Sequence, residues 1–276
     1  MADIKAADVA KLRKATGAGM MDCKNALVES NGDFDLAIDA IRKRGQAIAN
    51  KRADREATEG AVLSAVTSDG KRGAIIALNC ETDFVAKNED YVKFAKSILD
   101  VAIEQNPKDL DELKALTIDG EKIVDVVTNQ SGVTGEKLDL SYYAKVEAEK
   151  VVPYIHLGNR LATIVGFNMD ITDEQVGKDV AMQIAAMAPV AVDKDFVDAA
   201  TIEKELEIGK EQARQEGKPE AMLDKIAQGK LNKFFKENTL LNQAFVKNNK
   251  QDIRAYLKSV NSNLTVTEFK RFGLGN

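Results

Sequence analysis

The sequence predicts an α+β protein in three parts: an N-terminal three-helix module, a core of two related α/β subdomains, and a protruding antiparallel helical hairpin. Three observations lead to this prediction. Apolar residues recur at helical spacing through residues 3–44. Runs typical of β-strands begin at residue 60 and return in the same order near residue 151. Two strongly charged helical segments then follow one another within residues 201–230.

The N-terminal module is predicted to contain three short helices. Residues 16–19 end the first, because glycines disfavour helix and permit turn dihedrals. The second covers residues 20–30, and Gly32 followed by Asp33 supplies a C-cap and then an N-cap for the third. A core this small is marginal alone, so we expect the module to dock onto something else. Residues 45–59 form a linker or an exposed helix extension, and their charges suit a solvated surface as well as a functional one.

The first α/β subdomain is predicted from two β-like runs, residues 60–66 and 73–79. Asp69 and Gly70 lie between them and are a strong hairpin signal. A helix over residues 90–103 follows, with its apolar residues on one face. Three further segments complete this part: helices over residues 109–116 and 119–127, and a partly extended stretch over residues 133–149.

The second subdomain repeats the order strand, turn, strand and helix. Its predicted strands are residues 151–156 and 161–168, and its helix is residues 173–187. Four identities at a constant offset link the two hairpins: Gly70 with Gly158, Arg72 with Arg160, Ala74 with Ala162, and Ile76 with Ile164. The repeated order and these identities together predict two related subdomains packed side by side. A helix over residues 251–260 and a strand over residues 264–272 are expected to rejoin the second one.

The helical hairpin is predicted in residues 201–230, where residues 217–219 (Gly-Lys-Pro) separate two charged helices. Such a hairpin either projects from the body and contacts a partner or packs against the core. The predicted division of the chain is residues 1–55 for the module and linker, 56–145 for the first subdomain, 146–200 with 231–276 for the second, and 201–230 for the hairpin.

Composition narrows the class of protein. The chain has 276 residues and a net charge of −5 without a long basic run, so nucleic acid is a disfavoured partner. No apolar run approaches the roughly 20 residues of a membrane span, so no membrane partner is expected. Cys23 and Cys80 form no C-x-x-C motif, and residues 1–5 lack the apolar region of a secretory signal. We therefore expect a reduced, cytoplasmic chain.

Motifs for bond chemistry are absent from the sequence. The single histidine, His156, excludes a His-based metal site, and a Ser-His-Asp triad would rest on it alone. There is no phosphate-binding P-loop, and Gly17 with Gly19 lacks the third glycine and the preceding strand of a dinucleotide fingerprint. The sequence therefore predicts a protein that works by binding, without a metal or cofactor, rather than an enzyme.

Two long stretches resemble the signatures of the elongation factor Ts family. Residues 12–27 resemble the N-terminal signature, with Asn25 where that signature usually has Lys. Residues 79–86 (Asn-Cys-Glu-Thr-Asp-Phe-Val-Ala) match the second signature without a departure. Residues 217–219 and 268–272 are weaker matches, so the resemblance runs in order along nearly the whole chain. Some members continue past the final strand with a further module, whereas this chain stops at Asn276.

The resemblance implies both fold and activity. It implies a UBA-like N-terminal module and a guanine-nucleotide exchange factor that binds elongation factor Tu with GDP. In the family, the segment that corresponds to Thr82, Asp83, Phe84 and Val85 disturbs the partner's Mg²⁺ and phosphate site, so that GDP leaves and GTP binds. Spacing alone would place Phe84 in the core, because it follows a strand and precedes a helix; the signature instead implies that its ring acts as a wedge.

The resemblance also implies partner-binding residues. Arg13, Met20 and Met21 resemble the N-terminal contacts, although one of the two methionines could instead pack inside the module. Thr134 and Gly135 stand where the family often has Ile-Gly. His156 resembles a histidine of the second subdomain that faces another part of Tu. No residue of this chain is predicted to be catalytic, and none is predicted to bind a metal.

Two other functions remain open from the sequence. One is a non-catalytic adaptor, in which the helical module docks onto some other protein. The other is a hydrolase that uses His156. A homodimer through the hairpin or the core is a further association that the sequence leaves open.

Overall fold

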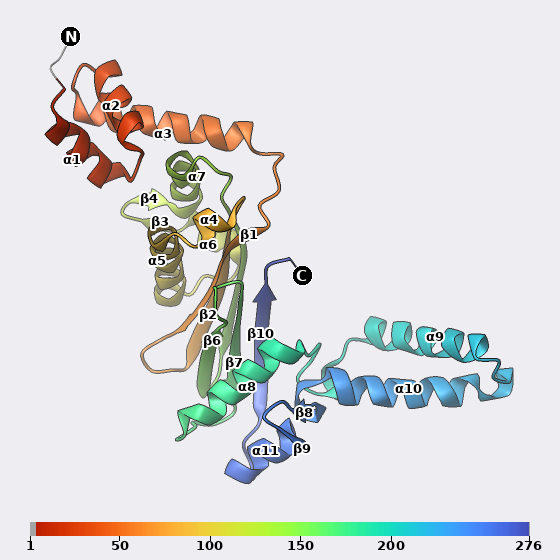
Figure 1. Ribbon diagram of the computed structural model, residues 1–276. Coiled ribbons are helices and arrows are strands. Elements are labelled where there is room, and N and C mark those ends of the chain that lie inside the picture. The colour runs from red at the N-terminus through yellow and green to blue at the C-terminus, as the bar shows by residue number, and fades with distance from the viewer. Residues whose placement is uncertain (1–3, 276) are drawn as a thin grey trace.

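The computed structural model describes residues 4–275. The chain forms an extended molecule, with the N-terminal helices at one end of a mixed core and a long helical hairpin projecting from it (Figure 1). This arrangement confirms the predicted α+β class and its three kinds of part.

The N-terminal module consists of helices α1 (Ala6–Thr16), α2 (Met20–Glu29) and α3 (Phe34–Lys51). Gly17 ends α1 with a left-handed backbone, φ 71°, which glycine adopts without steric cost. The Asp33 side chain accepts a hydrogen bond from the Leu36 N–H and starts α3. The apolar faces meet in one small core: Val9, Leu12, Ala18, Cys23, Ala26, Leu27, Ala37 and Ile41.

Helix α3 leaves this module and packs on the core. It continues to Lys51, so the first part of the predicted linker is a helix extension. Gly45 on α3 lies against Gly132 on α7 (Ile123–Thr134), and a Cβ added to Gly132 would be 2.4 Å from the Gly45 Cα. Two helices approach this closely only where both lack side chains, and this contact therefore fixes how the module sits on the core.

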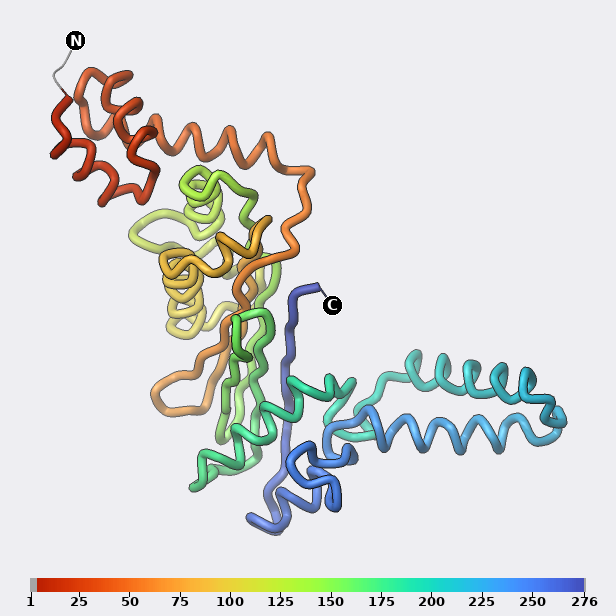
Figure 2. The backbone as a smooth tube through the Cα atoms, viewed as in Figure 1, coloured from red at the N-terminus to blue at the C-terminus, as the bar shows by residue number. Residues whose placement is uncertain are grey.

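Two three-stranded antiparallel sheets form the centre of the core (Figure 2). In each sheet the second strand of a hairpin is central, and a later strand pairs with its other edge. The first sheet contains β1 (Glu59–Val66), β2 (Arg72–Cys80) and β5 (Asp139–Glu147) in that order. The second contains β6 (Lys150–Ile155), β7 (Leu161–Phe167) and β10 (Val266–Gly273), with β7 in the middle. The predicted repeat of strand, turn, strand and helix is confirmed.

The sheets are buried on both faces. Val62 and Ile75 point between the two sheets, where they meet Ile164 of β7. Leu63 and Ile76 point to the opposite face, beneath helix α5 (Glu89–Gln105). The second sheet is covered likewise by α8 (Glu174–Met187) and α11 (Ile253–Val260). Burial on both faces explains why the strands appear in the sequence as continuous apolar runs.

One predicted element is wrong. Residues 119–127 were expected to form a helix, but residues 117–122 form a small hairpin of β3 (Thr117–Ile118) and β4 (Glu121–Lys122). Asp119 and Gly120 adopt φ values of 52° and 84°, and two successive left-handed residues cannot continue a right-handed helix. Helix α7 therefore begins only at Ile123, after the short helix α6 (Leu110–Ala115), and extends to Thr134.

The helical hairpin consists of α9 (Ala199–Gln215) and α10 (Leu223–Asn238), and it projects from the core rather than lying on it (Figure 1). The two helices are in close contact where Gly209 faces Ala227. A Cβ added to Gly209 would be 3.1 Å from the Ala227 Cα. Helix α10 continues past residue 230 into the core, beside the small strands β8 (Ala244–Phe245) and β9 (Asn248–Asp252). The predicted division into domains stays a prediction.

Within residues 4–275, none of the helices combines the length and the apolar character that crossing a lipid bilayer would need.

The close contact between α3 and α7 generates a stability prediction. Gly132→Ala is expected to lower the free energy of unfolding by about 1–3 kcal/mol, because the new methyl group overlaps the Gly45 backbone. Gly229→Ala is the matched control, since Gly229 also lies within a helix, α10, but has open space around it. That control is expected to gain up to about 1 kcal/mol from helix propensity. Urea denaturation of the two variants checks both signs, and equal stability of Gly132→Ala and the parent would contradict the close contact.

Candidate functional site

Phe84 is a large apolar side chain that the fold leaves in water. It lies on the one-turn helix α4 (Asp83–Ala86), directly after β2, and 83% of its surface is exposed. Its neighbours Val85 and Ala86 turn inward and pack against the core beneath the first sheet. Phe84 is therefore on the outer side of a helix whose other side is anchored, contrary to the position that spacing alone predicted.

Thr82 sets the start of α4. Its Oγ1 accepts a hydrogen bond from the Val85 N–H at 3.4 Å and donates one to Glu136 Oε1 at 2.6 Å. Asp83, the first residue of the helix, accepts from Lys87 Nζ at 2.6 Å. That hydrogen bond and the positive charge of Lys87 hold the pKa of Asp83 below its usual value, so Asp83 is an ionised carboxylate at neutral pH.

Residues 81–82 and 136–137 exchange hydrogen bonds between carboxylates and backbone. Glu136 Oε2 accepts from the Glu81 and Thr82 N–H groups, each at 3.0 Å. Glu81 Oε1 in turn accepts from the Lys137 N–H at 2.6 Å. We call Glu81, Thr82, Glu136 and Lys137 the carboxylate clamp. Bonds of this kind are shorter and stronger than bonds between neutral groups, so the clamp fixes the chain immediately before α4.

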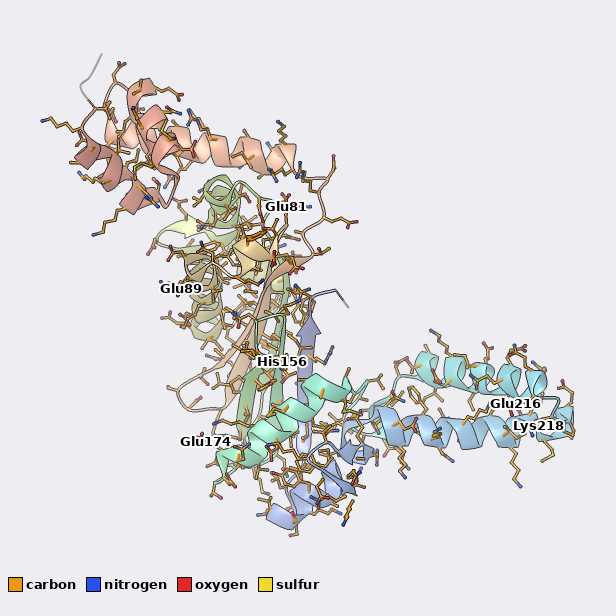
Figure 3. All side chains as sticks on the ribbon, viewed as in Figure 1. Glu81, Glu89, His156, Glu174, Glu216 and Lys218 are labelled. Carbon is orange, nitrogen blue, oxygen red and sulfur yellow. The ribbon has the colours of Figure 1, made fainter. Side chains whose placement is uncertain are left out.

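Two arginines neutralise the clamp. Arg52 Nη1 lies 2.8 Å from both Glu81 carboxylate oxygens, and Arg55 Nη1 lies 3.1 Å from Glu81 Oε2. Burial of the Glu81 carboxylate opposes its ionisation, but the hydrogen bonds from the Lys137 N–H and the arginines outweigh it, so the pKa of Glu81 is lowered. Figure 3 shows Glu81 at the top of the core, beneath the chain that leaves α3.

The side chains of Cys80 and Tyr91, which lie beneath α4, are buried and unreactive. The Cys80 thiol donates to the Thr82 carbonyl at 3.2 Å, and burial raises its pKa to about 11. The Tyr91 hydroxyl donates to the Leu78 carbonyl at 2.6 Å and ties the start of α5 to β2. Cys80 thus remains a protonated thiol at neutral pH and acts as a packing residue rather than a nucleophile.

The structure brings several predicted contact residues together. Arg13, Val85 and Thr134 line one hollow of about 500 Å³ between the N-terminal helices and α4. Gly135 ends α7 with φ 72°, and the Thr134 hydroxyl accepts a hydrogen bond from the Glu136 N–H at 3.2 Å. Thr134, the departure from the usual Ile, therefore helps to place the carboxylate that holds Thr82.

Met20 and Met21 both face solvent. They begin α2, and 58% and 63% of their surfaces are exposed, while Cys23 of the same helix fills the module's core. The open question of whether one methionine packs inside is decided by these positions: neither does. Paired flexible side chains on a surface suit an irregular partner.

His156 lies in the exposed turn between β6 and β7. The Asn159 carbonyl of this turn accepts from the Val62 N–H at 2.7 Å, and Arg160 forms an ion pair with Glu59. Glu59 is paired with Cys80 in the first sheet, so the turn sits at the end of the core that carries α4. The His156 Nδ1 forms a hydrogen bond with the Tyr154 hydroxyl at 2.9 Å, rather than with the serine and carboxylate of a catalytic triad. No group of three potential metal ligands occurs among residues 4–275.

The carboxylate clamp was not predicted from the sequence. Glu81 stands inside the second signature and Glu136 follows Thr134 and Gly135, yet neither was assigned a role. Leu157 was also missed, although 93% of its surface is exposed beside His156. No local signal marks the two glutamates, because acidic residues are abundant along the chain and the two lie far apart in the sequence.

Comparison with known proteins decides the family. The family model described as Elongation factor TS matches residues 81–276. The elongation factor Ts of Christiangramia forsetii is 52% identical over 276 residues, which is 100% of both chains. That of Porphyromonas gingivalis is 54% identical over 268 residues, 97% of both chains.

The chain belongs to the elongation factor Ts family. A more distant relative, the elongation factor Ts of Bacteroides thetaiotaomicron, is 41% identical over 325 aligned positions that cover 97% of this chain and 98% of the relative. The family predicted from the two signatures is confirmed. As a member of the elongation factor Ts family, the chain is a translation elongation factor and not a catalyst of bond chemistry.

The lowered pKa of Glu81 generates a prediction of how stability depends on pH. Its ionised carboxylate stabilises the fold above the unfolded pKa of about 4.3, and this contribution is lost as the pH falls through the lower folded value. Glu81→Gln is therefore expected to lower the free energy of unfolding by about 1–3 kcal/mol at pH 7. The difference from the parent should shrink below about pH 4.

Urea denaturation at pH 7 and near pH 3.5 measures this difference. Glu149→Gln is the control, because Glu149 pairs with Lys71 in an exposed bridge and its loss should cost less than about 1 kcal/mol. A Glu81→Gln difference that stayed constant between the two pH values would refute the assigned ionisation.

Proposed function

We propose that the chain is a guanine-nucleotide exchange factor that binds elongation factor Tu carrying GDP and promotes GDP release, so that GTP can bind. The observation that carries the proposal is the exposed ring of Phe84 on an anchored one-turn helix. Residues 82–85, here called the wedge segment, would disturb the Mg²⁺ and phosphate site of the partner.

The physical basis is the charge of the nucleotide. GDP is held largely through its phosphates, which are neutralised by Mg²⁺ and by backbone N–H groups at a loop and helix N-terminus. A side chain that pushes the surrounding helices apart displaces the cation and leaves the phosphate charge uncompensated. The affinity for GDP then falls without any covalent step.

Phe84 suits the role of a wedge. A phenylalanine ring is rigid, carries a large apolar area and loses little rotamer freedom on burial. The exposed ring contributes almost nothing to this protein's own core, so it remains available for contact with a partner. Asp83 beside it is a half-exposed carboxylate that could exchange Lys87 for donors on the partner.

The proposed docking residues surround the wedge segment. Arg13, Met20 and Met21 belong to the N-terminal helices, which the α3–α7 contact attaches beside the hollow next to α4. Thr134 and Gly135 end α7 at the clamp, and His156 occupies the turn at the same end of the core. These residues could contact one partner surface together, while Phe84 enters it.

The exchange must be reciprocal. If the factor weakens GDP binding, GDP weakens binding of the factor by the same ratio. GTP, which is abundant in the cytoplasm where we place this reaction, then refills the site and expels the factor. We propose no cofactor, nucleic acid or membrane in this cycle, and a homodimer through the hairpin or the core stays a prediction.

Phe84→Ala tests the proposal. The rate at which the protein releases labelled GDP from elongation factor Tu in a stopped-flow instrument is expected to fall by about tenfold or more, as for an interface hot spot. Phe196→Ala is the matched control, because Phe196 is also a phenylalanine with 71% of its surface exposed, on the chain between α8 and α9. Neither variant is expected to change the free energy of unfolding by more than about 0.5 kcal/mol.

The other outcomes are informative. Equal rates for Phe84→Ala and the parent would remove the wedge assignment. A parent protein that binds Tu equally with and without GDP, and does not speed GDP release, would favour the adaptor. His156→Ala should retain most of the exchange activity, whereas a hydrolase that depends on His156 would lose its turnover.

A further inference from the structure

We propose that Glu136 is a positioning residue for exchange: through the carboxylate clamp it holds the wedge segment with Phe84 directed outward. The inference rests on the proposed function. It assigns a role to a side chain that belongs to neither family signature and that lies far in the sequence from the residues it holds.

The wedge segment cannot hold its own conformation. Helix α4 has four residues, and a single turn of helix is unstable in isolation, because nucleation fixes several dihedrals for one hydrogen bond. Its geometry must therefore come from the contacts at its ends. Val85 and Ala86 anchor the inner side, and the N-terminal side depends on Thr82.

The Glu136 carboxylate accepts three hydrogen bonds, one from Glu81 and two from Thr82. One carboxylate oxygen accepts from the Glu81 and Thr82 N–H groups, and the other accepts from the Thr82 hydroxyl. The same hydroxyl oxygen caps α4 by accepting from the Val85 N–H. A shift of the Glu136 carboxylate would therefore move the cap, and the cap orients the turn of helix that carries Phe84.

Glu136 is itself held in place. The Thr134 hydroxyl accepts from its N–H, Gly135 closes α7 onto Ser131, and the Leu138 N–H donates to the Ser131 hydroxyl. The carboxylate thus projects from a segment that is fixed to the end of α7. A rigid support of this kind is what a positioning residue needs, because small displacements of a functional group are costly.

The clamp also ties the N-terminal helices to the wedge segment. Arg52 and Arg55 bind the Glu81 carboxylate, while Lys137 Nζ donates to the Ala53 carbonyl at 2.6 Å and to the Arg55 carbonyl at 3.0 Å. The chain between α3 and β1 is therefore held from both sides of the clamp. Docking through the N-terminal helices and insertion of Phe84 then occur on one connected support.

Glu136→Ala separates positioning from binding. Loss of the carboxylate leaves the Glu81 and Thr82 N–H groups without their acceptor, so α4 loses its fixed start. The maximal rate of GDP release from elongation factor Tu is expected to fall by about tenfold or more. The Tu concentration at half-maximal rate should change by less than about threefold, because the exposed residues of the N-terminal helices and the β6–β7 turn are untouched.

Two further variants make the comparison specific. Glu136→Gln is expected to restore the rate to within about threefold of the parent, since an amide oxygen can still accept both N–H groups and the amide nitrogen can donate to the Thr82 hydroxyl. Asp252→Ala removes a bond of the same kind, which the Ala255 N–H donates to the Asp252 carboxylate at the start of α11. Helix α11 lies at the far end of the core from α4 (Figure 1), so this control should exchange at the parental rate.

Amide hydrogen exchange of residues 80–86 provides a readout that does not depend on Tu. In the parent, the Glu81 and Thr82 amides should exchange slowly, and in Glu136→Ala at least about tenfold faster. Parental rates of GDP release in Glu136→Ala would overturn the positioning role while leaving the proposed function intact. A parent protein that fails to promote GDP release from elongation factor Tu would instead overturn the proposed function. Unchanged amide exchange in Glu136→Ala would overturn the role of Glu136 in holding residues 81–82.

Discussion

The hydrogen bonds that residues 81–82 and 136–137 exchange are the interaction on which the exposed position of Phe84 depends. A one-turn helix with an apolar side chain in water has little stability of its own. It persists here because the Glu136 carboxylate holds the backbone before it and the Glu81 carboxylate binds the Lys137 N–H in return, while Val85 and Ala86 anchor its inner side. The clamp contains two negative charges, and the arginines of the α3–β1 connection form ion pairs with one of them, Glu81. The α3–β1 connection and the start of the wedge segment are thus held by the same group of charges.

The overall architecture could be predicted because burial leaves a simple pattern. The strands are covered on both faces, so Val62 and Leu63 are both apolar although they point in opposite directions. The helices were visible from apolar residues on one face, and from caps such as Asp33. The small hairpin at residues 117–122 was not predictable in this way, because its Asp119 adopts a left-handed backbone that its residue type permits but does not require. The end of α10 at Asn238 was also not predictable from the sequence, because it depends on contacts with the core such as the hydrogen bond from the Val190 N–H to the Asn238 carbonyl.

The candidate site could be predicted only in part. Spacing alone placed Phe84 in the core, and the resemblance to a family reversed that expectation. The clamp escaped both approaches, since Glu81 and Glu136 resemble the many surface glutamates of an acidic chain and their partners are backbone N–H groups. Met20 and Met21 illustrate the same limit: helical spacing could not tell which of two adjacent methionines faces outward, and the structure exposes both.

The pairing of β7 with β10 has a consequence for the order in which the molecule is built. The first sheet is formed entirely by residues 59–147. In the second sheet, Phe167 of β7 pairs with Val266 of β10, and the whole α9–α10 hairpin is synthesised between these two strands. A nascent chain can therefore complete the N-terminal helices and the first sheet while β7 still has an open edge. During that interval the unpaired edge of β7 can pair with a strand of another chain. The second sheet is therefore the part of the nascent chain for which protection by a chaperone matters most.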